Sequence, residues 1–60
     1  MRTIVRKEVD FYKYSDGMST YVDTITFEYT SPSGLMKQIR THKKELREKN
    51  PWYRIYEVLD

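Results

Sequence analysis

Polar and apolar residues alternate along the first half of the chain, a pattern that predicts two β-strands, at about residues 2–14 and 19–30. Successive side chains of a strand point to opposite faces of its sheet. Phe11 therefore marks the apolar side of the first strand, and Ile25 and Phe27 mark that of the second. A Ser-Asp-Gly turn signal separates the two strands, so we expect them to form an antiparallel hairpin.

The register of this hairpin decides whether its two apolar sides meet. A two-residue loop at Asp16-Gly17 would pair odd-numbered with even-numbered residues and place Phe11 on the face opposite Ile25 and Phe27. We therefore expect a three- or five-residue loop, or a bulge with the glycine at positive φ. Either device would gather these three side chains, with Leu35, into one core.

The segment after the hairpin predicts one helix, at about residues 32–49. Ser31 suits the N-cap and Pro32 suits the first turn. An apolar stripe recurs at helical spacing and should pack on the sheet; it consists of Leu35, Ile39 and Leu46. Asn50-Pro51 ends the helix, because proline disfavours a helical residue before it and cannot continue the hydrogen-bond ladder.

Residues 52–59 predict a third strand. It is apolar on both sides, with Tyr56 on one and Ile55 on the other, so the pattern leaves open which side meets the helix. The element order is ββαβ. We expect one α+β domain over residues 1–60: a three-stranded, mainly antiparallel sheet in the order 2-1-3 with one helix packed on one face.

Composition narrows the classes of protein. The chain has 60 residues and no cysteine, which excludes disulfides, thiolate metal sites and a thiol nucleophile. Its apolar runs are too short to span a membrane, and its start lacks the apolar core of a signal peptide. We interpret the sequence as a complete cytoplasmic protein and expect no membrane partner.

Candidate catalytic groups are few. The single histidine, His42, falls on the apolar stripe, which favours a structural role over a chemical one. Scattered carboxylates lie on predicted strand surfaces beside lysine and arginine, where solvated cross-strand pairs explain them; they are Glu8, Asp10, Asp23 and Glu28. The chain also lacks a glycine-rich phosphate loop. We therefore expect no enzyme activity, no metal and no cofactor.

Four basic residues of the predicted helix fall within about 80° of one another around its axis. They are Lys37, Arg40, Lys44 and Arg47. The formal net charge of +2 is small, and its whole excess lies in residues 32–60. Such a stripe could lie along the phosphates of a nucleic acid. The simpler interpretation is a solvated helix face, which lysine and arginine fill because they favour helices.

The sheet face turned away from the helix should retain apolar and aromatic residues. The predicted partner-binding set comprises Tyr12, Tyr14 and Val22, with Arg6 and Arg54 at or near its rim. Tyr21 falls on the core side in this assignment. Tyrosine is favoured at protein interfaces because it is rigid and can hydrogen-bond, although tyrosines can also tile an open sheet with their hydroxyls in water.

In layout, length and lack of cysteine, the sequence resembles small phage-encoded proteins that bind and inhibit host enzymes such as polymerases or nucleases. The likeness is one of layout, and no motif transfers residue roles. It implies a protein-binding inhibitor or accessory factor. We therefore expect a protein-binding module, self-associating or acting on a larger protein; the alternative is a nucleic-acid binder that uses the helix stripe or the tyrosine face.

Overall fold

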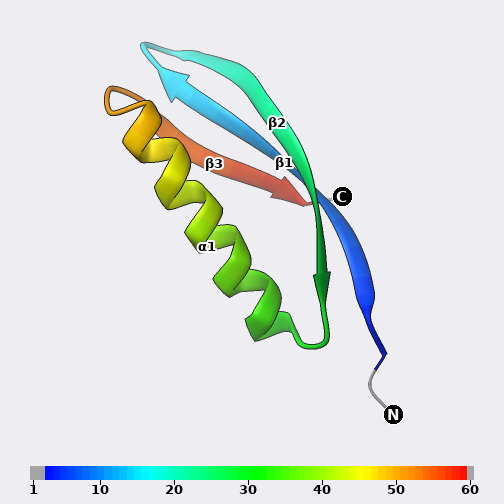
Figure 1. Ribbon diagram of the computed structural model, residues 1–60. Helices are drawn as coiled ribbons and strands as arrows, with labels where there is room; N and C mark the ends of the chain where they lie inside the picture. Colours follow the sequence, from blue (N-terminus) through cyan, green and yellow to red (C-terminus); the bar gives the residue numbers. More distant parts are fainter. Residues whose placement is uncertain (1–2, 60) are drawn as a thin grey trace.

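A computed structural model describes residues 3–59, which form a three-stranded sheet with one helix on one of its faces (Figure 1). The elements run β1 (Val5–Ser15), β2 (Met18–Tyr29), α1 (Pro32–Lys49) and β3 (Arg54–Leu59). Both strand pairs are antiparallel and the sheet order is β2-β1-β3. The predicted fold class and strand order are confirmed. The predicted start of the first strand, at residue 2, and both ends of the predicted domain lie outside the described residues.

The hairpin turn differs from the prediction. Asp16 and Gly17 form a two-residue turn, with φ angles of 52° and 77°, and Ser15 pairs with Met18. Positive φ at both central residues is the signature of a type I′ turn, whose twist matches that of the flanking strands. The expected three- or five-residue loop is therefore wrong, whereas the positive φ of Gly17 is confirmed.

A bulge at Val22, well away from the turn, corrects the register. Tyr12 lies opposite Tyr21, but the preceding residue Phe11 lies opposite Asp23, so Val22 has no partner on β1. Beyond this point odd-numbered residues pair with odd-numbered ones, as Lys7 does with Phe27. One extra residue in β2 thus returns the apolar sides of both strands to the same face.

The core lies between this face and α1. It consists of Val9, Phe11, Phe27, Leu35, Ile39, Leu46 and Ile55. The rings of Phe11 and Phe27 meet edge to face with centroids 6.2 Å apart. Ile25 is half-buried and packs against the cluster, as do Val22 and Tyr29. The predicted gathering of Phe11, Ile25, Phe27 and Leu35 on one side of the sheet is confirmed.

The ends of α1 are closed by local hydrogen bonds. Ser31 Oγ accepts from the Gly34 amide at 3.3 Å, an N-cap bond, and Pro32 begins the helix. At the other end, Asn50 donates to the Leu46 carbonyl from both its backbone and its side chain, each at 2.9 Å. These bonds satisfy backbone groups that a helix terminus otherwise leaves without partners.

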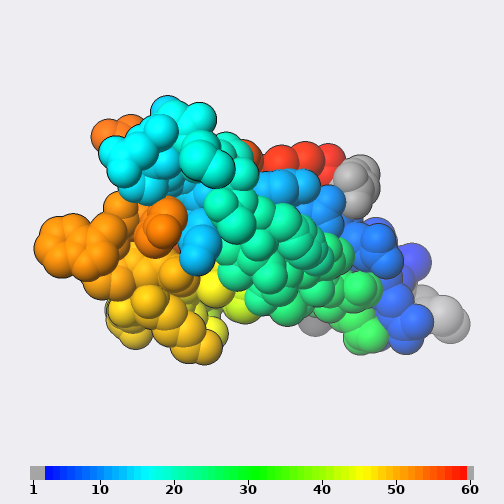
Figure 2. All heavy atoms as spheres, turned by 90° about the horizontal axis from the view of Figure 1, so that it is seen from above, coloured from blue at the N-terminus to red at the C-terminus, as the bar shows by residue number. Residues whose placement is uncertain are grey.

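The segment between α1 and β3 is a turn rather than the start of a strand. The Tyr53 amide donates to the Asn50 carbonyl at 3.1 Å, so β3 begins at Arg54, two residues later than predicted. Trp52, in this turn, is 87% exposed. The orange segment that follows α1 projects at the same end of the molecule as the cyan hairpin turn (Figure 2).

The register of β3 settles which of its sides meets the helix. Ile55 pairs with Lys13 and is buried, while Glu57 pairs with the core residue Phe11. Glu57 also forms an ion pair with Lys43 of α1, with Nζ and Oε2 3.0 Å apart. Tyr56 therefore points to the sheet face that α1 leaves uncovered.

Candidate functional site

The uncovered face of the sheet, called here the outer face, carries a row of three tyrosines. Tyr12 of β1 lies opposite Tyr21 of β2 and opposite Tyr56 of β3. The rings of Tyr12 and Tyr56 are stacked, with centroids 5.4 Å apart and planes 12° apart. The Tyr12 and Tyr21 rings meet edge to face at 5.8 Å. We call these three residues the tyrosine row; it crosses every strand of the sheet.

The flanking members of the tyrosine row stay accessible. Tyr21 is 51% exposed and Tyr56 is 37% exposed, whereas Tyr12 is half-buried between them. Exposed Tyr14 and Val58 belong to the same face, because they lie two residues from Tyr12 and Tyr56 along their strands. The result is an aromatic patch near the hairpin end of the sheet.

A chain of hydrogen bonds fixes one end of the row. Thr24 Oγ1 donates to Asp10 Oδ1 at 2.6 Å, and the Tyr21 hydroxyl lies 2.6 Å from the same threonine oxygen. Because the threonine proton is given to Asp10, the tyrosine hydroxyl is the donor in the second bond. The Tyr21 ring is therefore held by its hydroxyl as well as by Tyr12.

The structure places most of the predicted sheet-face residues on the outer face, but not all of them near the tyrosine row. Tyr12 and Tyr14 lie on the outer face, and Arg54 pairs with Tyr14 there. Arg6 lies farther along β1, away from the tyrosine row, and forms an exposed ion pair with Glu28 at 3.0 Å. Its predicted place at the rim of the patch is therefore not supported.

The prediction for Val22 is wrong, because this residue packs against the buried cluster. The predictions for Val22 and Tyr21 fail for one reason: strict alternation along β2 ignores the bulge at Val22. The two-residue turn sets the register as far as the bulge, so Tyr21 pairs with Tyr12 and lies on the outer face. A two-residue turn at Asp16-Gly17, if assumed from the sequence, would have predicted this position for Tyr21. Nothing in the sequence marks Val22 as the extra residue.

Charges on the outer face are of both signs. Arg54 and the Arg6–Glu28 pair share it with Glu8 and with Asp10, which accepts the bond from Thr24. Basic groups do not dominate among these described side chains. Stacking platforms for single-stranded nucleic acid set their aromatic rings in a positively charged groove, and this face lacks that balance.

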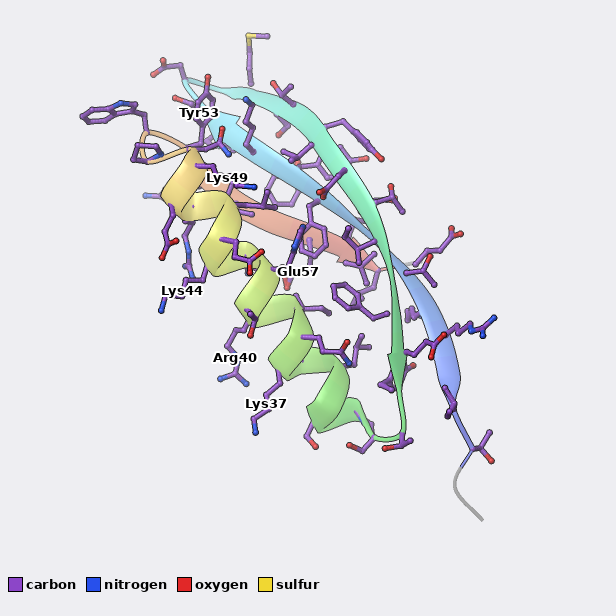
Figure 3. All side chains as sticks on the ribbon, in the orientation of Figure 1. Lys37, Arg40, Lys44, Lys49, Tyr53 and Glu57 are labelled. Carbon is purple, nitrogen blue, oxygen red and sulfur yellow. The ribbon has the colours of Figure 1, made fainter. Side chains whose placement is uncertain are left out.

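The predicted helix stripe is assembled on the side of α1 that faces solvent. Lys37, Arg40 and Lys44 project away from the sheet (Figure 3). With Arg47 they line a shallow groove, to which Thr41 also contributes. We call these four basic residues the basic stripe. Within residues 3–59, none of the four has a carboxylate oxygen within 4.0 Å.

Neighbouring members of the basic stripe stand three or four residues apart, where like charges repel. Such pairs destabilise a helix by about 0.2–0.5 kcal/mol each. Only Arg47, in the last turn, gains from the negative end of the helix dipole. The stripe therefore costs α1 a little stability.

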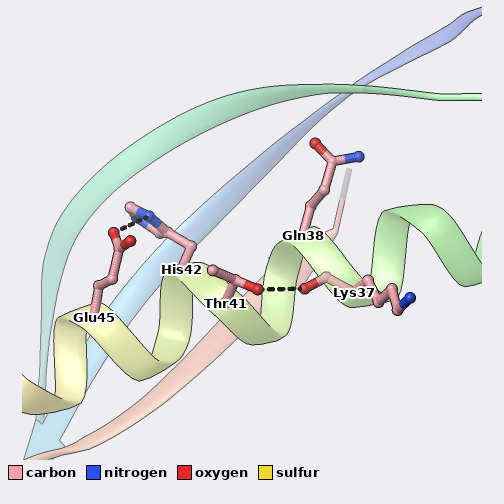
Figure 4. A pocket seen from close by; sticks show the side chains of 5 residues that line it. All are labelled: Lys37, Gln38, Thr41, His42 and Glu45. Atoms are coloured by element: carbon pink, nitrogen blue, oxygen red, sulfur yellow. Dashed lines mark hydrogen bonds and ion pairs between the residues drawn. The ribbon is translucent and has the colours of Figure 1, made fainter.

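His42 lies at a second groove, beside Lys37, Gln38, Thr41 and Glu45 (Figure 4). Its ring packs on Phe11 with centroids 4.5 Å apart. Nε2 lies 3.3 Å from a carboxylate oxygen of Asp23, and Nδ1 lies 4.0 Å from one of Glu45. Both ring nitrogens thus face carboxylates, and the neighbouring Thr41 hydroxyl donates to the Lys37 carbonyl at 3.0 Å. The groove holds no nucleophile paired with the histidine.

Comparison with protein-family models, with curated proteins and with solved structures finds no match in any of the three. No helix within residues 3–59 is long and apolar enough to cross a membrane. In the same part of the chain, no three histidine, aspartate or glutamate side chains gather as a metal site would require. The two candidate sites are therefore the tyrosine row and the basic stripe.

Proposed function

We propose that this protein is a small, non-catalytic binding module that contacts another protein through the outer face of its sheet. The observation that carries the proposal is the tyrosine row. The ring of Tyr12 contacts those of Tyr21 and Tyr56 on the face that α1 leaves uncovered, and these two flanking rings remain accessible.

Preorganisation supports a binding role for this row. Tyrosine offers a large, rigid contact area at a low cost in conformational entropy. Here the rings are already ordered by one another, and Tyr21 is also held through Thr24. A surface fixed before binding loses less entropy when a partner arrives. Exposed Tyr14 and Val58 widen the patch toward the few hundred Å² at which exposed apolar surface often marks a contact site.

The remaining features favour binding over catalysis. His42 packs on Phe11 and faces two carboxylates, an arrangement that suits a structural histidine. The proposal therefore includes no cofactor and no reaction. It places the protein in the cytoplasm, in keeping with a chain that contains no cysteine.

Two kinds of protein partner fit this surface. One is a second copy of the chain, joined outer face to outer face. The other is a larger protein that the module inhibits or assists. Sedimentation velocity over a range of concentrations separates them, because only the first gives a mass that rises with concentration in the isolated protein.

The test compares two immobilised variants. Tyr21→Ser with Tyr56→Ser removes the accessible rings of the row. The control Tyr53→Ser removes a ring outside the row, in the turn before β3, where the Lys13 ammonium lies 4.6 Å from its centroid. We expect the wild type and the control to self-associate or to retain one protein from the native host, and the double variant to do neither. Retention of the same protein by all three would refute the proposal.

Identification of the face needs a second measurement. When the retained protein is added to the isotopically labelled module, amide shifts should change around Tyr12, Tyr14 and Tyr56, and those of α1 should stay in place. Circular dichroism of each variant verifies that the loss of binding does not come from unfolding.

A further inference from the structure

We propose that the basic stripe of α1 binds the phosphodiester backbone of duplex nucleic acid without regard to base sequence. The stripe lies on the side of α1 that faces away from the sheet (Figure 3). The tyrosine row lies on the outer face, on the other side of the sheet from α1. This inference is independent of the proposed protein-binding role, and the two partners could be held at once.

The stripe has the length that such a contact requires. From Lys37 to Arg47 it spans ten helical steps, or about 15 Å along the axis. Successive phosphates of one strand rise about 3.4 Å along a duplex, so several lie within its reach. The groove that the four basic side chains line is shallow, and the Thr41 side chain borders it.

The charges of the basic stripe form no ion pair with the described side chains. Lys43, on the adjoining side of α1, is paired with Glu57, and Glu45 approaches His42. The four members of the stripe have no such partner among the described side chains, and they repel one another at helical spacing. A polyanion laid along them would relieve that repulsion and release its own counterions.

The residues around the basic stripe favour the backbone of a duplex over two other polyanionic partners, a single strand and a membrane surface. Single-strand platforms need aromatic rings beside the cations, and the groove is lined by none. Helices that lie in a membrane surface insert an apolar face, but the apolar face of α1 is buried against the sheet. Contacts to phosphates alone position a protein on a duplex and carry no sequence information.

The experiment measures fluorescence anisotropy with two labelled DNA duplexes of unrelated sequence. We expect equal affinity for both, and a log–log salt slope of about three to four, because each phosphate contact contributes about 0.9. Arg40→Gln with Lys44→Gln should lower the slope by about two and weaken binding at least tenfold at low salt. The control, Lys7→Gln with Lys49→Gln, changes the net charge equally outside the stripe and outside the tyrosine row, and should bind nearly as the wild type does.

Three results would overturn the inference. The first is no binding by the wild type at low salt, and the second is an equal loss in both double variants, which would reflect net charge alone. The third is displacement of the duplex by polyglutamate at equal charge concentration, which would mark the stripe as a site for acidic protein segments. Thermal melting of the Arg40→Gln and Lys44→Gln protein should show no loss of stability, since the substitutions remove repulsion.

Discussion

Lys43 of α1 and Glu57 of β3 form an ion pair whose Nζ and Oε2 atoms lie 3.0 Å apart, with both side chains roughly three-quarters buried. Glu57 projects toward the helix from the same side of β3 as the buried Ile55. The pair therefore ties the last strand to the helix at the border of the core. Partial burial shields it from solvent more than the exposed Arg6–Glu28 pair is shielded.

This difference in burial leads to a prediction about stability. A double-mutant cycle with Lys43→Ala and Glu57→Ala, followed by urea unfolding, should give a coupling free energy of about 1 kcal/mol. The same cycle on Arg6 and Glu28 should give less than about 0.5 kcal/mol and vanish in concentrated salt. Equal coupling in both pairs would contradict the argument from burial.

The second prediction concerns Phe27, which is buried against Phe11 and α1. Phe27→Ala should lower the free energy of unfolding by about 3–5 kcal/mol, because it removes an aromatic ring and leaves a cavity. That is a large part of the stability of a domain of this size. Thr26→Ala, on the exposed neighbour, is the control and should change stability by less than about 0.5 kcal/mol.

The third prediction concerns the bulge. Deletion of Val22 removes the one residue of β2 that has no partner on β1. The pairs from Phe11–Asp23 onward then continue the register that the two-residue turn sets. Deletion of Thr26 removes a paired residue instead. The chain must then turn either Phe27 or Ile25 toward water.

We therefore expect the Val22 deletion to unfold cooperatively in urea and to be more stable than the Thr26 deletion by about 2–5 kcal/mol. Contacts between Phe11 and Phe27 should persist in nuclear Overhauser spectra of the first protein. A Val22 deletion that fails to fold would show that the bulge itself, rather than the register it restores, holds the sheet together.

The comparison of sequence with structure shows where local patterns suffice. Ser31, Pro32 and Asn50 mark both ends of α1 because capping is decided within a few residues. The strand order also follows from the pattern and from short connections. The expected odd-length loop is wrong, because the turn at Asp16-Gly17 has two residues; the expected bulge is present, but it lies in β2 at Val22 rather than at the glycine.

The tyrosine row could be predicted only in part. The sequence pattern places Tyr12 on the correct face. Tyr21 and Tyr56 lie beside it because of strand pairings that the pattern of a single strand does not contain. The position of Tyr21 depends on which residue of β2 is left unpaired, and that of Tyr56 depends on which side of an apolar strand meets α1. Both choices are settled by packing across the sheet. The basic stripe, in contrast, lies within one helix, so the helical period alone predicts its four members.

The unpaired residue in β2 also affects the order in which the chain can fold. A hairpin that zips from its type I′ turn forms in about 1–10 μs, and its simplest ladder runs on without interruption. That ladder pairs every backbone group yet turns Phe27 to water, so an early hairpin competes with the native one. Burial of Phe27 against Phe11 and beneath α1 favours the native ladder instead. The register of β1 and β2 is thus decided by burial of the core rather than by the turn, and the local preference of the hairpin conflicts with the overall fold.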